Sequence, residues 1–325
     1  MGARITGTGS HVPAKIVTNE QLEKMVDTSS EWIVQRTGIR SRHLLEESEL
    51  PSDMGVKAGK QALAAANISP EQVDLLLVAT NFPDMICPGS APFIADGLGL
   101  GSAPFFDLKA GCTGFVYGVA VANGLIESGM FPRVLVVGLE ALSRVTDWTD
   151  RRTCVLFGDG AGAALLETGT KTSGVLGSSL YGDASKAMFL NMPAGGTRSP
   201  ASSETLSQGD HFLKMEGAGV FRNAAPMMEK ATLAALDNAN LSLADVDWII
   251  PHQANQRIID ALVRKLDVSE DRVIVNLDRV ANTSTASIPM ALDEEIRSGK
   301  IQPGDVIVMT GFGAGVTYGA VVLKV

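Results

Sequence analysis

The chain has 325 residues, of which 45% are apolar, and its 27 Lys and Arg against 36 Asp and Glu give a net charge of −9. This composition excludes a disordered chain, because disordered chains are poor in apolar residues, and the length suggests roughly two domains. The acidic balance argues against broad nucleic-acid binding, because phosphate backbones repel negative charge.

Apolar segments that are typical of strands alternate along the chain with helical patterns. In chain order, we predict a strand that begins near Arg4 and further strands over 74–80, 134–140, 154–167, 247–252, 273–276, 305–315 and 318–325. Continuous apolar segments of this kind are typical of strands that are covered on both faces. The spacing of apolar residues predicts helices over 53–66, 115–126, 222–238 and 254–266. Alternating strands and helices indicate a layered α/β protein.

The two halves of the chain resemble each other, which predicts a duplicated α/β unit. The matched segments are 70–80 with 243–253, 111–129 with 281–299, 133–138 with 305–310, and 157–166 with 312–322. Because the four matches keep the same order, we divide the chain into halves over 1–170 and 171–325. Two such units packed together would bring their matching loops to one shared site.

Cys112 is the first candidate for chemistry. It stands between Gly111 and Thr113-Gly114, directly before a predicted helix. The positive end of a helix dipole and the free backbone N–H groups there favour a thiolate. The neighbouring glycines let a substrate approach the backbone closely. The alternative is a small buried cysteine that packs between helix and strand.

His252 and Asn282 are two further candidates. His252 ends the predicted strand 247–252, and polar exits from strands are where doubly wound folds place their ligands. Asn282 occupies the counterpart of the Cys112 turn in the second half. Each has a structural alternative, a hydrogen-bonded histidine and an asparagine N-cap. The duplication favours chemistry, because it places Cys112 and Asn282 at equivalent positions and His252 on a neighbouring strand.

Four motifs in chain order resemble β-ketoacyl-acyl carrier protein synthase III, a condensing enzyme of the thiolase superfamily. They are AGCTGF (110–115), PHQANQRI (251–258), ANTSTAS (281–287) and GFGAGVTYG (311–319), and similarity extends to 26–43 and 149–166. The resemblance covers essentially the whole chain. It implies a thiolase-like, five-layered αβαβα fold built from the two duplicated halves, and a homodimer.

The resemblance also implies a Cys-His-Asn triad formed by Cys112, His252 and Asn282. The Cys112 thiolate would take an acyl group from acyl-CoA, and the covalent intermediate divides one hard step into two. Malonyl-acyl carrier protein would then lose CO2, while His252 and Asn282 donate hydrogen bonds to the enolate oxygen. The backbone N–H groups of Cys112 and Ala314 would form a second oxyanion hole. The implied product is β-ketoacyl-acyl carrier protein, which initiates fatty-acid biosynthesis.

The resemblance places the substrates and partners at named residues. Trp32 and Arg151 would stack on the two faces of the adenine of CoA. The other implied CoA contacts are Thr28 and Arg36 at the nucleotide end, and Gly217 and Asn255 along the pantetheine arm. A basic patch suits an acidic carrier protein, and the residues expected there are Arg222, Arg257, Arg264 and Lys265.

Three departures from the family pattern carry expectations of their own. Ala281 and Ala314 stand where glycine is usual, and an alanine with positive φ costs stability. Arg152 replaces a small residue at the CoA entrance. The resemblance implies that a side chain near residue 87 reaches the acyl pocket across the dimer, with Leu142 and Phe157 as walls. Cys87 is smaller than the usual aromatic residue, which predicts room for a starter longer than acetyl.

The remaining expectations concern compartment and cofactors. Three cysteines without a C-x-x-C spacing suit a reducing compartment and no zinc site. Neither a signal core nor a membrane-length apolar segment is present in the sequence. We expect a cytoplasmic enzyme that contacts neither a membrane nor nucleic acid. Acyl-CoA is a substrate, so no cofactor and no metal are expected.

Three other functions remain at this point. The nearest is a related acyltransferase or condensing enzyme of specialised metabolism, of polyketide or quinolone type, which would keep the triad and use another acceptor. A cysteine protease shares the order Cys, His, Asn, but the C-G-[SA]-C-[WY] signature is absent. A non-catalytic subunit would be expected to lack Cys112. The preferred acyl starter and the pathway stay open.

Overall fold

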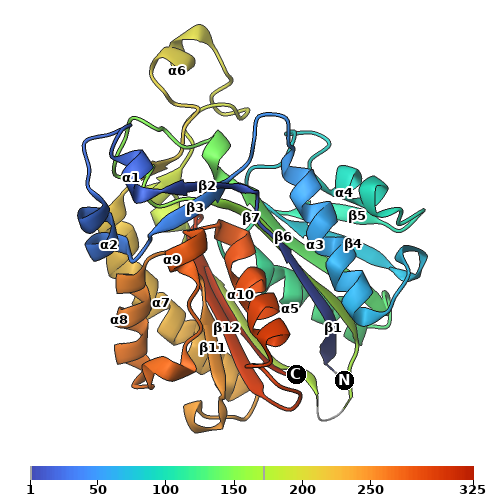
Figure 1. Cartoon of the computed structure of the whole chain (residues 1–325). Helices are drawn as coiled ribbons and strands as arrows, with labels where there is room; N and C mark the ends of the chain where they lie inside the picture. The colour runs from blue at the N-terminus through green and yellow to red at the C-terminus, as the bar shows by residue number, and fades with distance from the viewer. Residues whose placement is uncertain (1, 171–172) are drawn as a thin grey trace.

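The computed structural model describes residues 2–170 and 173–325, and it contains two large sheets (Figure 1). The first sheet has the strand order β1-β7-β6-β4-β5. Strands β4, β5 and β6 run parallel, and β7 is antiparallel to both β6 and β1. Their bounds are β1 (Ala3–His11), β4 (Leu75–Ala79), β5 (Phe105–Leu108), β6 (Arg133–Ala141) and β7 (Asp159–Thr168).

The second sheet repeats most of this pairing pattern with residues of the second half. Its order is β11-β12-β13-β8, in which β11 and β12 are parallel and the other neighbours are antiparallel. Its strands are β8 (Gly174–Gly182), β11 (Trp248–Pro251), β12 (Val306–Gly313) and β13 (Thr317–Lys324). The pattern of β4-β6-β7-β1 therefore recurs as β11-β12-β13-β8. The boundary that we placed between residues 170 and 171 falls at a position outside the described residues.

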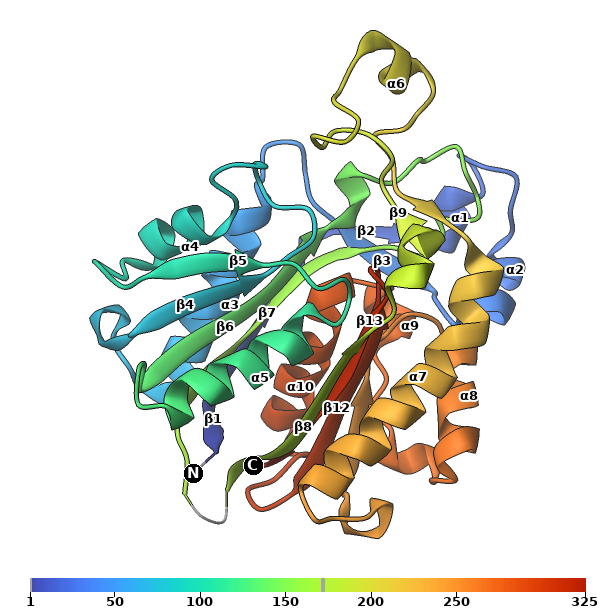
Figure 2. The same cartoon turned by 180° about the vertical axis from the view of Figure 1, so that it is seen from behind.

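Helices form the other three layers (Figure 2). One pair covers the outer face of the first sheet, a second pair lies between the sheets, and a third covers the outer face of the second sheet. In that order the pairs are α3 (Pro51–Ala66) with α4 (Ala91–Leu98), α5 (Gly114–Glu127) with α10 (Ser287–Ser298), and α7 (Gly217–Asn238) with α8 (Gln256–Leu266). The predicted five-layered αβαβα fold is confirmed.

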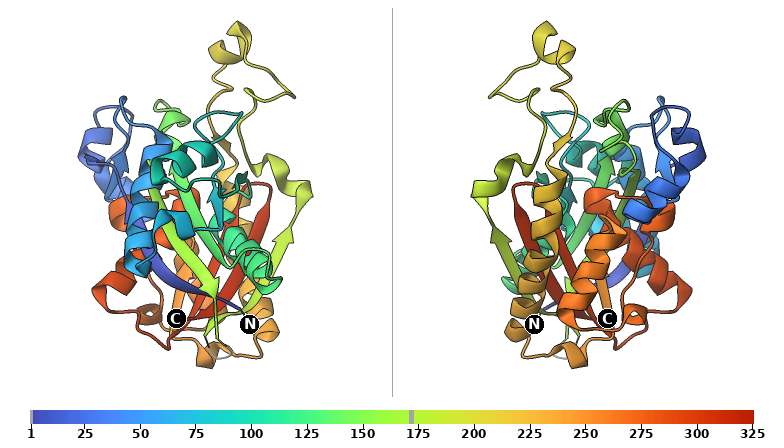
Figure 3. Two further views of the ribbon diagram at one scale, coloured as in Figure 1. Left: turned by 90° about the vertical axis from the view of Figure 1, so that its right-hand side faces the viewer. Right: turned by 90° about the vertical axis from the view of Figure 1, so that its left-hand side faces the viewer.

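Shorter elements gather at the end of the sheets where the candidate site lies. Figures 1 and 3 show α6 at the tip of an excursion that projects beyond the rest of the molecule. The short helices and strands are α1 (Asn19–Leu22), α2 (Ser30–Thr37), α6 (Ser203–Ser207), α9 (Leu277–Val280), β2 (Lys15–Thr18), β3 (Ser41–Leu44), β9 (Leu190–Asn191) and β10 (Lys214–Met215). The 3₁₀ segments, which lie at both ends of the sheets, are η1 (Pro70–Gln72), η2 (Leu142–Arg144), the kinked η3 (Ala184–Phe189), η4 (Leu243–Asp245), η5 (Glu270–Arg272) and η6 (Ser284–Ala286).

Small residues bring the outer helices close to the sheets in both halves. A Cβ added to Gly9 of β1 would lie 2.2 Å from the carbonyl oxygen of Ala58 in α3. In the second half, a Cβ on Gly177 of β8 would lie 2.4 Å from the carbonyl oxygen of Ala235 in α7. Real Cβ atoms do not approach this closely, so glycine is required at both positions. The same packing device thus serves the two repeated units.

One strand prediction was wrong in part and another was wrong. Residues 154–158 are not in β7, because Phe157 forms an isolated bridge with Asn282 and the chain turns there. Residues 273–276 form no strand, since Val273 makes one isolated bridge to Ile249 and the side chain of Gln253 then takes the place of a ladder partner. In the part of the chain that the structure describes, no helix is long and apolar enough to cross a bilayer.

Candidate active site

The structure brings Cys112, His252 and Asn282 to one cavity of about 360 Å³. Cys112 directly precedes α5, which lies between the sheets. His252 directly follows β11, and Asn282 lies in the turn between α9 and η6. The three residues therefore come from three separate segments that the duplicated fold places together. All three side chains are largely buried, with Cys112 8% exposed.

The loop of Cys112 lies tightly against the loop that follows β12. A Cβ on Gly313 would stand 2.2 Å from the backbone nitrogen of Cys112, so this approach needs glycine. The hydroxyl of Thr317 lies 2.6 Å from the Ala110 carbonyl oxygen, to which it donates. Backbone N–H groups of Ala314 and Cys112 are hydrogen-bonded to the Cys112 sulfur. The two amides of the expected oxyanion hole thus converge on the nucleophile.

The electrostatic environment of Cys112 differs from our expectation. Burial raises the pKa of the Cys112 thiol to about 11, and the charge of Glu140 adds to this rise. Hydrogen bonds from Ser284, Ala314 and its own backbone lower the pKa, but by less than burial raises it. The backbone N–H hydrogen bonds act in the predicted direction, but burial outweighs them in the free enzyme. At neutral pH the resting group is a thiol.

His252 is a neutral imidazole held by one side chain. Burial lowers its pKa to about 3. Its Nδ1 lies 2.7 Å from the hydroxyl oxygen of Ser287, and that oxygen also accepts a hydrogen bond of 3.4 Å from the Gln253 backbone N–H. The Ser287 hydroxyl has no acceptor other than Nδ1 among the described residues, so we assign its proton to the bond with Nδ1. The Nε2 atom of His252 then carries the ring proton and can donate it.

Asn282 is fixed by backbone and side-chain bonds. Its N–H donates to the Leu156 carbonyl oxygen at 3.0 Å, and its own carbonyl oxygen accepts from Gly158 at 3.1 Å. The side-chain oxygen Oδ1 accepts from the Ser284 backbone N–H at 2.9 Å. Among the described residues the amide nitrogen Nδ2 has no protein hydrogen-bond partner. This nitrogen is therefore available as a donor to a substrate.

The two alanines of the sequence pattern have different outcomes. Ala281 has φ of 60°, in the region where glycine is favoured, so this departure from the family pattern carries backbone strain. Ala314 is not among the residues with positive φ, and in that loop the positive value of 128° falls on Gly315. The expected cost at residue 314 does not arise.

The mouth of the cavity holds four of the six residues implied for CoA, namely Trp32, Arg36, Gly217 and Asn255. The other two, Thr28 and Arg151, are not among its lining residues. The guanidinium carbon of Arg151 lies 5.5 Å from the Trp32 ring centroid, and Arg151 donates to the Asp27 carbonyl oxygen at 2.7 Å. A base between them needs two layers of contact at roughly 3.5 Å each. The adenine stack that the resemblance implies would therefore require Arg151 to move outward.

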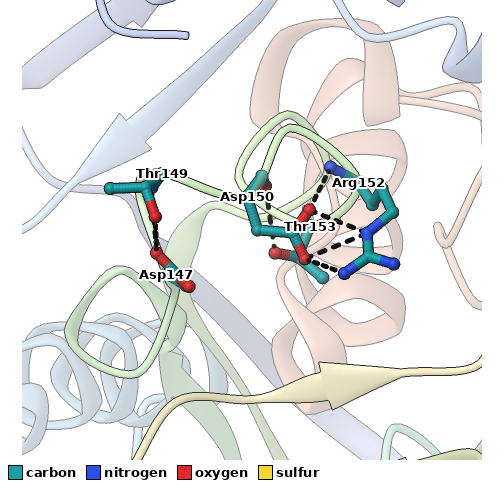
Figure 4. Close-up of polar contacts among 5 residues, drawn as sticks. All are labelled: Asp147, Thr149, Asp150, Arg152 and Thr153. Atoms are coloured by element: carbon teal, nitrogen blue, oxygen red, sulfur yellow. Dashed lines mark hydrogen bonds and ion pairs between the residues drawn. The ribbon is translucent and has the colours of Figure 1, made fainter. Parts of the chain in front are cut away.

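The loop after η2 is ordered by its own side chains (Figure 4). Arg152 donates to Asp150 through Nε at 2.9 Å and Nη2 at 3.0 Å. Asp147 accepts from the hydroxyl of Thr149 at 2.6 Å, and the Thr153 hydroxyl donates to the Asp150 carbonyl oxygen at 3.2 Å. Arg152 also lines the cavity, as its position at the CoA entrance led us to expect. Its charge there is offset by Asp150.

A second cavity of about 260 Å³ begins on another side of Cys112. Leu142 and Phe157, the two predicted walls of the acyl pocket, both line it. Cys87 does not line this cavity in the single chain, and its side chain is exposed. Cys112 lines both cavities. It therefore lies where a long acyl donor in the larger cavity would meet a short acyl group in the smaller one.

The four expected basic residues lie on α7 and α8, and all are exposed. Arg257 lines the cavity mouth, and its guanidinium packs on the ring of Phe221 at 5.5 Å. Arg222 is the next residue along α7. Lys265 forms an ion pair of 3.0 Å with Glu229 of α7, so its charge is already matched. Arg264 precedes it on α8.

Sequence reasoning missed Glu140, Ser284 and Ser287. The two serines lie within the motif ANTSTAS, and their spacing from Asn282 was a signal of proximity to the site. Glu140 is the one acidic residue in the apolar strand β6, and buried acids need partners. That contrast was the signal that pointed to it.

Comparison with known proteins identifies one family. The model for 3-oxoacyl-[acyl-carrier-protein] synthase III matches residues 106–191, and the model for the C-terminal part of the same enzyme matches 236–325. The chain is 48% identical to beta-ketoacyl-[acyl-carrier-protein] synthase III of Caldanaerobacter subterraneus, over 100% of this chain and 98% of the relative. It is 49% identical to the Desulfitobacterium hafniense (strain Y51) protein of the same name, over 98% and 97%. The crystal structure of 3-oxoacyl-[acyl-carrier-protein] synthase III from Aquifex aeolicus matches with a TM-score of 0.92 and 41% identity, over 100% of both chains.

Proposed function

The chain belongs to the β-ketoacyl-acyl carrier protein synthase III family, and from this membership we propose that Cys112, His252 and Asn282 carry its reaction. The enzyme condenses an acyl-CoA starter with malonyl-acyl carrier protein, releases CO2 and CoA, and initiates fatty-acid biosynthesis. The observation that carries the residue assignment is the cavity that all three side chains share. This cavity joins the surface to the Cys112 sulfur.

The first step transfers the acyl group to Cys112. The sulfur attacks the thioester carbon, the bond to the CoA sulfur breaks, and the proton of the thiol ends on free CoA. Backbone N–H groups of Cys112 and Ala314, which contact the sulfur in the free enzyme, would stabilise the charge on the thioester oxygen. The N-terminus of α5 supports negative charge at the same place. The result is acyl-Cys112.

The second step forms the carbon–carbon bond. The malonyl carboxylate leaves as CO2, and the electron pair becomes an enolate whose oxygen accepts from His252 Nε2 and Asn282 Nδ2. The low pKa of His252, caused by burial, keeps it a neutral donor. Neutral donors fixed in advance stabilise charge only as it develops. The carbanion then attacks acyl-Cys112 and releases Cys112 as a thiolate, which takes one proton from solvent to return to the resting thiol.

The substrates would occupy the two cavities. CoA would lie in the larger one, against Trp32 and Arg36, with its arm passing Gly217 and Asn255 toward Cys112. Arg151 and Thr28 would join these contacts after the shift of Arg151 described above. The acyl chain would fill the smaller cavity between Leu142 and Phe157. Both substrates supply all the reacting atoms, so we propose no cofactor and no metal.

A second copy of the chain would complete the pocket. Strand β5 is the edge of the first sheet, and Phe105 and Phe106 on it are 46% and 42% exposed. Ile86, in the neighbouring loop, is 84% exposed. Unpaired sheet edges with apolar side chains are pairing surfaces. We therefore propose a homodimer through β5, in which the loop of Cys87 reaches toward the partner.

The acidic carrier protein would dock beside the cavity mouth. Arg257 lines the cavity, Arg222 directly follows in α7 the Phe221 on whose ring Arg257 packs, and Arg264 lies seven positions further along α8. We give Lys265 a smaller role, since it is paired with Glu229. Complementary charge raises the rate of encounter more than the affinity.

The three cysteines are free, which supports a cytoplasmic location.

The proposal is tested by the complete reaction and its variants. Purified enzyme, an acyl-CoA series and malonyl-acyl carrier protein should give β-ketoacyl-acyl carrier protein and CO2. Replacing His252 or Asn282 by Ala removes one donor to the enolate oxygen, and such a loss costs about 100- to 1000-fold in kcat. Thr232→Val is the matched control, because its buried hydroxyl has no partner among the described residues. Full activity of the His252 and Asn282 variants would reject the assignment.

A further inference from the structure

A carboxylate lies directly behind the active-site turn. Glu140 is the last residue but one of β6 and its side chain is completely buried. It lines neither cavity, so it does not touch substrate. Nothing in the two chemical steps described above uses it. A buried ionisable group requires partners, because desolvation penalises its charged form.

The partners of Glu140 in the described chain are hydrogen-bond donors from the end of β4. The backbone N–H and the side-chain Nδ2 of Asn81 donate to Oε1 at 2.8 Å and 2.6 Å. The Phe82 N–H donates to Oε2 at 3.3 Å. An ionised carboxylate accepts at both oxygens, whereas a glutamine would turn two N–H groups toward other donors. These donors favour the ionised carboxylate, whereas burial outweighs them and raises the pKa of Glu140 to about 7.

One further donor links Glu140 to the catalytic residues. The hydroxyl of Ser284 donates to Oε1 of Glu140 at 3.3 Å, and its oxygen is the hydrogen-bond partner of the Cys112 thiol. The Ser284 backbone N–H holds Oδ1 of Asn282 at 2.9 Å. Ser284 has φ of 50°, a strained value for a serine that its surroundings must maintain. A serine of the second half is thus tied to strands of the first half.

We propose that Glu140 is a positioning residue, which holds Ser284 and through it Asn282 so that the amide nitrogen of Asn282 meets the enolate oxygen. This role rests on the proposed function of Asn282. It makes the condensation step depend on Glu140 more than the acylation step does, because Asn282 acts only after Cys112 is acylated. The charge of Glu140 also raises the pKa of Cys112, after burial. A neutral residue at position 140 would therefore loosen Asn282 while easing ionisation of Cys112.

The test separates the two steps in the full-length Glu140→Gln enzyme. Acylation is followed as the mass increase of the protein on mixing with the acyl-CoA that acylates the wild type fastest. Condensation is followed as loss of that mass when the pre-acylated enzyme meets malonyl-acyl carrier protein. We expect condensation to slow about 10- to 100-fold, below the full cost of losing an oxyanion donor. Acylation at pH 7 should be unchanged or faster.

Asp159→Asn is the matched control. Asp159 begins β7, the strand beside β6, and is as buried as Glu140. It accepts from the N–H groups of Leu45 and Ser143 at 2.8 Å each, away from the Cys112 turn. This control should keep the wild-type ratio of the two rates. The proposal is overturned if Glu140→Gln slows both steps equally, or leaves condensation within about threefold of the wild type.

A second variant keeps the test decisive if Glu140→Gln does not fold. Ser284→Ala removes the link but leaves the carboxylate with Asn81 and Phe82. It should also slow condensation more than acylation. The pH dependence of Cys112 alkylation should move to higher pH in Ser284→Ala, and to lower pH in Glu140→Gln. Equal slowing of both steps by Ser284→Ala overturns the positioning role. A wild-type enzyme that fails to acylate or condense rejects the proposed function instead.

Discussion

The hydroxyl of Ser287 lies 2.7 Å from Nδ1 of His252, and this contact decides which ring nitrogen carries the proton. The Ser287 oxygen accepts from the backbone N–H of Gln253, and Nδ1 is the one acceptor for its own proton among the described residues. With Nδ1 as acceptor, Nε2 is the donor. Ser287 begins α10, five residues after Asn282, so the same segment carries one donor and orients the other.

Ser287→Ala should therefore weaken condensation and spare acylation. Without the hydroxyl, Nδ1 of His252 loses its donor, and the imidazole populates the tautomer that cannot donate from Nε2. We expect a loss of about tenfold or more in the condensation rate, because orienting partners of a catalytic histidine contribute on that scale. Single-turnover mass spectrometry of acyl-Cys112 measures it. Thr232→Val again serves as control for loss of a buried hydroxyl.

The pH dependence of stability should carry the signature of Cys112. Burial raises the pKa of its thiol from 9.0 to about 11, so between these values the folded chain keeps a proton that the unfolded chain has lost. Stability is then present below pH 9 and is lost as pH rises toward 11. A difference of two pKa units corresponds to about 3 kcal/mol. The free energy of unfolding of wild type and Cys112→Ser, measured with denaturant between pH 8 and 11 to span these two pKa values, checks this prediction. If the stabilities of wild type and Cys112→Ser change with pH in parallel, the prediction is contradicted.

Arg151 should contribute to binding of the nucleotide and not to chemistry. It already packs on Trp32 at 5.5 Å, and this cation–π geometry would extend to an adenine ring. Arg151→Ala should raise KM for acyl-CoA about five- to tenfold, with kcat unchanged, because such contacts contribute about 1 kcal/mol. KM for the corresponding acyl-pantetheine, which lacks the nucleotide, should not change. Arg133→Ala, at an ion pair with Glu167 on β7, provides the control.

The acyl pocket should respond to residue 87 only in the dimer. Cys87 is exposed in the single chain, yet its loop lies beside the edge strand β5. Cys87→Phe should restrict the enzyme to short starters, because filling a pocket by a few methylenes changes selectivity by about 10- to 200-fold. Adding Phe106→Asp, which places a charge on the proposed interface, should give monomers in light scattering. Unchanged selectivity of Cys87→Phe in a dimer would contradict the proposed path of this loop.

The sequence predicted the parts of the fold that repeat. The matched segments of the two halves led to Cys112, His252 and Asn282, and the structure places these three residues on one cavity. Strands with unbroken apolar patterns, such as β4 and β12, were also predicted, because both of their faces are covered. β8 was missed because its sequence GVLGSSLYG has no such pattern.

Properties that depend on remote contacts could not be predicted. The segment 154–158 has the apolar pattern of a strand, but Asn282 pairs with Phe157 and turns the chain. The pKa of Cys112 shows the same limit. Its position at a helix N-terminus is local and visible in sequence, whereas burial and the charge of Glu140, which raise the pKa, arise from packing. Ser284 and Ser287 belong to a recognised motif, but their partners lie in other segments.

The central claim is that Cys112 carries the acyl group between the two substrates. Wild-type enzyme and Cys112→Ala should each be incubated with acyl-CoA thioesters from acetyl to medium chain, and the adducts mapped by mass spectrometry of peptides. We expect one acyl group on the peptide that contains Cys112, its loss on addition of malonyl-acyl carrier protein, and no adduct in the variant. An adduct on another residue, or product formed by Cys112→Ala at the wild-type rate, would contradict it.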